Sequence, residues 1–126
     1  MNEKLNSRSV KADFYDYDFE NDSLLVIDRG AKYESSINFE NIILDIDVDG
    51  LPIGVEILHA SKLFDVSKSA IKNFQSFRAD INISEKTIEI NFTINVIKRN
   101  QYIEKIAISH GINDMNLPSA KIAMAC

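Results

Sequence analysis

Cysteine and histidine are scarce in this sequence, with one cysteine and two histidines among 126 residues. The single cysteine, Cys126, excludes an intramolecular disulfide, and no Cys or Cys/His spacing is typical of a zinc site. A cysteine nucleophile needs a neighbouring base, but no motif pairs His59 or His110 with Cys126. From these residues we identify no catalytic, metal or cofactor site, which favours a protein that is not an enzyme.

Long apolar runs are also missing. No run approaches the roughly 20 residues that a membrane span needs, and the polar residues 1–12 lack the apolar segment of a signal peptide. We therefore expect a cytoplasmic protein without membrane contact. At 126 residues and 45% hydrophobic content, we expect a single domain over residues 1–126, able to bury roughly two-thirds of its unfolded surface.

Basic residues are rare in one part of the chain. The net charge is −5, but residues 13–56 alone carry −10, from twelve acids against Arg29 and Lys32. The flanking segments are net positive. A concentrated acidic surface repels phosphate backbones, so we expect no nucleic-acid binding. The same surface suits the basic half of a second copy, or a basic partner protein.

One motif allows two incompatible interpretations. The run Asp45-Ile-Asp-Val-Asp-Gly50, with Glu56 behind it, matches a calcium-binding loop. Its oxygen ligands would be Asp45, Asp47, Asp49, the Leu51 carbonyl and Glu56. Such a loop lies between two helices, and the flanking residues decide whether it exists.

Those flanks favour a β-hairpin. Apolar and acidic residues alternate strictly from Leu44 to Asp49, which is the period of a half-buried strand. Pro52 lacks the backbone N–H that pairs one calcium loop with another, and Asp49-Gly50 is a strong hairpin-turn signal. We predict strands over 42–48 and 53–58. The three aspartates then form a solvated strand face, or alternatively a weak cation site.

The remaining elements are strands around one helix. Alternation or short apolar runs predict strands over 14–19, 24–28, 33–38, 77–84, 88–96 and 102–109, and a packed strand over 120–124. Apolar residues spaced by three and four predict a helix over 61–75, capped by Ser61 or Asp65 and with a break near Ser67. The predicted fold class is α+β: a mostly antiparallel sheet in two meander or hairpin groups, with this one central helix packed on it.

Two motifs resemble a known family. Tyr17-Asp-Phe-Glu-Asn-Asp-Ser-Leu-Leu-Val-Ile27 is similar to the opening Y-D-x-x-x-D-x-L-x-I of the small prokaryotic domain of unknown function 2283. Gly54-Val-Glu-Ile-Leu-His-Ala-Ser61 follows its G-I-E-I-L-x-A-S stretch. The resemblance covers about residues 15–64 and implies a four-stranded unit followed by a helix. It implies no activity, and residues 65–126 form an extension beyond it.

Three functional hypotheses remain. The leading one is a non-enzymatic protein-binding module that forms a homodimer and neutralises a small basic partner. The second is a metal-responsive domain that uses the strand face of Asp45, Asp47 and Asp49. The third is an enzyme that uses carboxylates such as Asp16, Asp18 or Glu56, which would need a pocket that shifts a pKa toward neutrality.

Overall fold

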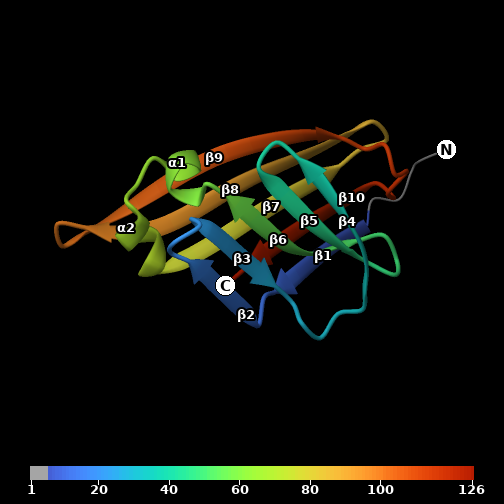
Figure 1. Ribbon diagram of the computed structural model, residues 1–126. Coiled ribbons are helices and arrows are strands. Elements are labelled where there is room, and N and C mark those ends of the chain that lie inside the picture. Colours follow the sequence, from blue (N-terminus) through green and yellow to red (C-terminus); the bar gives the residue numbers. More distant parts are fainter. Residues whose placement is uncertain (1–5) are drawn as a thin grey trace.

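The computed structural model describes residues 6–126, which form two five-stranded sheets stacked face to face with two short helices at one end (Figure 1). We call the sheet with the order β2-β3-β6-β5-β4 the front sheet, and the sheet with the order β1-β10-β7-β8-β9 the back sheet. All neighbours in the front sheet are antiparallel. In the back sheet, only β1 and β10 run parallel.

The front sheet comes from one continuous stretch of the chain. Its strands are β2 (Phe14–Asp18), β3 (Ser23–Ile27), β4 (Tyr33–Phe39), β5 (Ile42–Asp47) and β6 (Pro52–Leu58). This confirms the predicted strands of this half and the β5–β6 hairpin. The unit has five strands, however, rather than the four that the family resemblance implied, because β4 pairs with β5 over most of its length.

The back sheet joins both ends of the chain. Its strands are β1 (Asn6–Lys11), β7 (Ser76–Ile83), β8 (Thr87–Lys98), β9 (Gln101–Ile112) and β10 (Ala120–Ala125). The predicted three-stranded meander and the packed C-terminal strand are confirmed. The alternation in the sequence gave no sign of β1, which is a mostly polar strand. Of its side chains that the structure describes, that of Val10 is buried.

One hydrophobic cluster contains residues from both sheets. Alternate side chains of each strand point into it, as period-two patterning predicts. Leu24 and Val55 from the front sheet and Ile90 and Phe92 from the back sheet are all fully buried. The two sheets therefore share the core between them.

The helical segment corrects the sequence prediction. Instead of one helix over 61–75, two five-residue helices occur, α1 (Ala60–Phe64) and α2 (Lys68–Lys72). Asp65 takes a left-handed conformation (φ 54°), which ends α1. The predicted break is confirmed: the Ala70 N–H donates to Ser67 Oγ at 3.1 Å. The N-cap of α1 is His59, not Ser61 or Asp65.

The fold class is therefore mostly β, and the predicted α+β class overstated the helix content. The two helices do pack on the core, as predicted, through the buried residues Phe64 and Ile71. They lie over β8 and β9 (Figure 1). Neither helix in residues 6–126 has the length or apolar character that crossing a bilayer requires.

Candidate functional site

The loop around Asp47 is a hairpin turn. β5 and β6 flank it as antiparallel strands, so the hairpin interpretation is confirmed and the calcium-loop interpretation is wrong. The Asp47 carboxylate accepts hydrogen bonds from the Asp49 and Leu51 N–H groups at 2.9 and 3.0 Å, and from Arg8 at 3.1 Å. Burial would raise the pKa of Asp47, but these hydrogen bonds outweigh it and lower the pKa below its ordinary value.

The predicted acidic strand face is not formed as such. Asp45 lies within β5 and accepts a hydrogen bond from Ser36 Oγ at 2.7 Å. Asp47 is 6% exposed and is used by the turn, and Asp49 lies beyond the strand. Within residues 6–126, no three histidine, cysteine or acidic side chains are placed to hold a metal ion together.

The motif residues of the front sheet form a hydrogen-bonded network. Asp22, 6% exposed, lies in the β2–β3 turn. Its carboxylate accepts from Tyr17 OH at 2.5 Å, from Ser61 N–H at 3.0 Å and from Ser61 Oγ at 2.6 Å. Burial favours a higher pKa for Asp22, but the Ser61 and Tyr17 hydrogen bonds prevail and lower it. The network joins the β2–β3 turn to α1, so its role is structural.

Gly54 also has a structural role. A Cβ at this position would lie 2.6 Å from Ile27 Cγ1, which faces it across the β3–β6 pair. Real Cβ atoms do not approach that closely, so the spacing of β3 and β6 depends on glycine here.

Three of the predicted carboxylates do come together. Asp16, Asp18 and Glu56 line a shallow depression of about 380 Å³ on the front sheet, with His59 beside them. Two of the carboxylates are already engaged: Asp18 accepts from the Asn21 N–H and side-chain amide, and Glu56 accepts from Ser23 Oγ. The hydrogen bonds from Asn21 lower the pKa of Asp18, which is opposite to the shift that a general acid needs.

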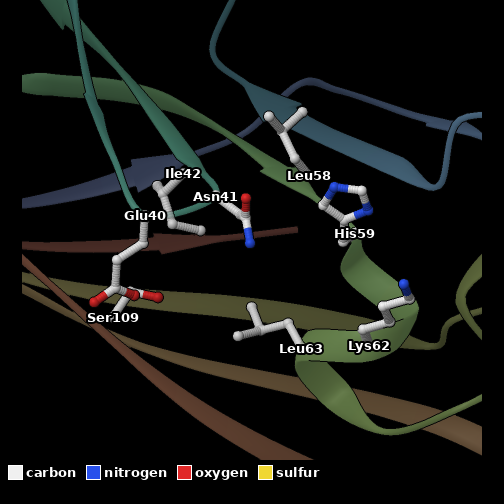
Figure 2. Close-up of a pocket in the computed structure, with 8 residues that line it drawn as sticks. All are labelled: Glu40, Asn41, Ile42, Leu58, His59, Lys62, Leu63 and Ser109. Carbon is white, nitrogen blue, oxygen red and sulfur yellow. The ribbon is translucent and has the colours of Figure 1, made fainter.

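A second depression lies between the sheets, where the β4–β5 turn meets α1 and β9. Its volume is about 430 Å³. Figure 2 shows His59 and Lys62 on one side of this cleft and Glu40 and Ser109 on the other. Its other lining residues are Asn41, Ile42, Leu58 and Leu63.

The Ser109 side chain is the unusual polar group of this cleft. It is 1% exposed and lines the cleft from β9 (Figure 2). The sequence carries no signal for this residue, because a serine within an alternating strand is indistinguishable from any other core-facing small residue.

Cys126 is not an activated nucleophile. Its backbone pairs with Phe77 through two hydrogen bonds of 3.1 Å, and its side chain packs against the core. Burial raises the pKa of the thiol, which disfavours the reactive thiolate.

The most distinctive surface of the molecule is β9. This 12-residue strand is at the edge of the back sheet. Its outward side chains include Tyr102, Ile106, Ile108 and Ile112, which are 76%, 64%, 53% and 72% exposed. We call these four the apolar row of β9. Long apolar edge strands with unpaired backbone groups are where other strands pair.

The charge asymmetry of the sequence divides between the two sheets. The acidic residues 13–56 build almost all of the front sheet. The rest of the chain, which is net positive, builds the back sheet and the helices. The two outer faces therefore differ in charge, as well as in apolar exposure.

Comparisons with known proteins agree with the resemblance noted in the sequence. Residues 15–61 match the model of a family described as "Protein of unknown function (DUF2283)". No solved structure shows a match to the chain.

Two relatives cover most of the chain. A Methanosarcina mazei protein named "Putative hypoxanthine phosphoribosyltransferase" is 42% identical over 104 residues, covering 82% of this chain and 85% of the relative. An uncharacterized protein of Methanocaldococcus jannaschii is 36% identical over 110 residues, covering 86% and 95%. With the match over residues 15–61, these similarities show that the chain belongs to the DUF2283 family.

Proposed function

We propose that this protein is a self-associating protein-binding module in which β9 is the docking strand. The observation that supports it most is the combination of length and exposure in β9. The strand has 12 residues and a free edge, and it carries the apolar row of Tyr102, Ile106, Ile108 and Ile112. A second copy that pairs with this edge removes apolar surface from water and satisfies the backbone groups of both strands.

Light scattering coupled to size exclusion tests this function. The chain mass is 14.3 kDa, and we expect twice that mass for the wild type at micromolar concentration. The double variant Ile106→Lys/Ile108→Lys places charges on two exposed positions of the row, and we expect it to be monomeric with an unchanged circular dichroism spectrum. Tyr33→Lys, on the front-sheet edge strand β4, is the matched control and should stay dimeric. A wild-type monomer at every salt concentration would rule out the proposal.

The front sheet supplies the second part of this function. Its outer face carries Asp16, Asp18 and Glu56 around one depression, and its stretch of chain has a charge of −10. We propose that a small basic protein docks there, on the sheet that β9 pairing leaves free. Binding to such a partner should weaken steeply with salt. The variant Asp16→Asn/Asp18→Asn/Glu56→Gln should lose it while still dimerising, and equal retention of basic proteins by both forms would contradict this.

The cleft of Figure 2 favours a second candidate function. The name of the Methanosarcina relative implies a purine base. Here the apolar side chains of Leu58 and Leu63 line the cleft from opposite sides, together with the Asn41 amide and Ser109 (Figure 2). Planar bases bind in such sites, with apolar contact on their faces and hydrogen bonds at their edges.

Calorimetry with hypoxanthine, and separately with phosphoribosyl pyrophosphate, tests this second candidate. If it is right, hypoxanthine should bind to the wild type and bind at least tenfold more weakly to Ser109→Ala. Ser84→Ala, in the exposed β7–β8 turn, is the control that should bind as the wild type does. No heat with either compound at millimolar concentration would remove this candidate and leave the binding module.

A further inference from the structure

We propose that two copies pair their β9 strands antiparallel about a two-fold axis at Ala107, and that Lys105 of each copy completes the Figure 2 cleft of the other. This inference rests on the proposed self-association. It adds the register of the two strands and the contacts between copies, which the self-association alone does not specify.

The direction of the backbone groups limits the registers that are available. The Asn113 N–H donates to the Lys86 carbonyl at 2.9 Å, toward β8. In an antiparallel ladder the direction alternates along the strand, so the even-numbered residues of β9 present their N–H and C=O to the free edge. The His110 N–H follows this rule and donates to Glu40 Oε1 rather than to β8, at 3.4 Å.

The same even-numbered residues carry the outward side chains. A second copy that continues the sheet must therefore place its even-numbered residues opposite those of the first, as hydrogen-bonded pairs. Two-fold axes at neighbouring positions of β9 satisfy this condition, and the side chains decide between them.

Only an axis at Ala107, among the central positions of β9, sets polar side chains opposite polar ones and apolar side chains opposite apolar ones on the outer face. An axis at Lys105 sets two lysines against each other, and axes at Ile106 or Ile108 set Glu104 against an isoleucine. Like charges directly opposite destabilise a strand pair. With the axis at Ala107, the outer face pairs Tyr102 with Ile112, Glu104 with His110 and Ile106 with Ile108.

The inner face in this register brings Lys105 beside the cleft of the second copy. Lys105 is then directly opposite Ser109 of that copy, and Glu40 lines the same cleft (Figure 2). Within one copy, Lys105 and Ser109 are four residues apart on one strand, roughly 13 Å. There Lys105 lines a different groove, of about 580 Å³, beside α2. The lysine therefore reaches the Glu40 cleft from the neighbouring copy and not from its own.

Pairing exchanges one hydrogen bond for another. In the single copy, Glu40 covers the free edge by accepting the His110 N–H, and 3.4 Å is long for such a bond. In the pair, the His110 N–H donates to the Glu104 carbonyl of the second copy. The released Glu40 carboxylate then faces the ammonium of the second copy's Lys105.

Engineered disulfides test the register. In a Cys126→Ser background, Ala107→Cys puts two thiols on the axis, in a non-hydrogen-bonded pair with Cα atoms about 4.5 Å apart, which suits a disulfide. We expect rapid conversion to a covalent dimer under mild oxidation. Glu104→Cys is the matched control, because the two copies of residue 104 are then roughly 20 Å apart, and it should stay uncrosslinked.

A charge exchange tests the contact between copies. Lys105→Glu and Glu40→Lys should each weaken the dimer by tenfold or more, and the double variant should recover most of the affinity, because the pair is rebuilt with reversed charges. Light scattering that shows a dimer without an Ala107→Cys crosslink would overturn the register and leave the self-association standing. A monomeric wild type would overturn both.

Discussion

The edge strands β9 and β4 contact each other across the sandwich, yet they differ in every property that governs strand pairing. β9 has 12 residues, regular pairing with β8 and an exposed apolar row. β4 has seven residues, a register shift between Tyr33 and Ser35, and a polar sequence. Short, irregular, polar edges resist further pairing. The β4 edge of the front sheet is therefore less suited to further pairing than the β9 edge of the back sheet.

The largest effect on dimerisation should come from changing the edge of β9 itself. Ile108→Pro removes a backbone N–H that faces the free edge, and should abolish dimerisation while costing little in the single copy, because that N–H is not used by β8. Sedimentation should show a monomer. Asn38→Pro in β4 is the matched change on the other edge, because Asn38 lies opposite Ile43 in a pair whose backbone groups point away from each other. A loss of dimer there instead would reverse the comparison.

The second-largest effect should come from changing the contact between the two edge strands, β9 and β4. A Cβ on Gly111 of β9 would lie 2.5 Å from the ring of Phe39 in β4. Gly111→Ala should therefore destabilise the fold by about 1–3 kcal/mol through overpacking, measured by urea unfolding. Adding Phe39→Leu, which removes part of the ring, should recover a portion of that loss. An additive double variant would show that the two strands are not packed as described.

The front sheet depends instead on buried hydrogen bonds. Asp22→Asn weakens the acceptor of the Tyr17 and Ser61 hydrogen bonds and should cost about 1–3 kcal/mol at pH 7. The folded-state pKa of Asp22 is lowered, so its contribution is fully present above the unfolded pKa of about 3.9. It is lost as the pH falls through the folded pKa. Variant and wild type should therefore converge in acid, and a constant difference down to pH 2 would contradict this.

Substitutions of Asp47 and Asp49 distinguish a hydrogen-bonded hairpin turn from a loop that binds a cation. Asp47→Asn should destabilise the protein by about 1–2 kcal/mol, because the carboxylate holds two backbone N–H groups and Arg8. Asp49→Asn, at an exposed turn position, should stay within about 0.5 kcal/mol. Thermal unfolding measures both. Stabilisation of the wild type by millimolar calcium that Asp49→Asn removes would restore the cation interpretation.

The smallest effect is expected on the open face of the back sheet. Arg78 and Asp80 form an ion pair of 2.8 Å, but both side chains are more than a third exposed. Such pairs contribute little, because solvent screens them. Arg78→Ala should therefore leave the unfolding free energy and dimerisation nearly unchanged, as measured by urea unfolding and light scattering. A larger loss would mean that this face is covered in the assembly.

The strand pattern could be predicted because it depends on local alternation. The run from Ile88 to Val96 indicates one buried and one wet face without knowledge of any partner strand. The helix could not be bounded in the same way. The apolar stripe from Leu63 to Phe74 is continuous, but the left-handed conformation of Asp65 interrupts it, and the sequence pattern does not encode that conformation strongly.

The candidate site was less predictable than the fold. The apolar row of β9 reads in the sequence as ordinary alternation, and only the sheet order places it on an edge and outward. Asp16, Asp18 and Glu56 were identified from the sequence, but their meeting in one depression depends on the pairing of β2, β3 and β6.

The sequence by itself determined which residues alternate, where the hairpin turns, and that the acidic residues gather in one stretch, because these properties depend on neighbours along the chain. The tertiary structure alone decided that β1 joins the last strand, that Asp22 meets Ser61, and that β9 has a free edge. Those properties depend on contacts between distant residues, which side-chain periodicity does not specify.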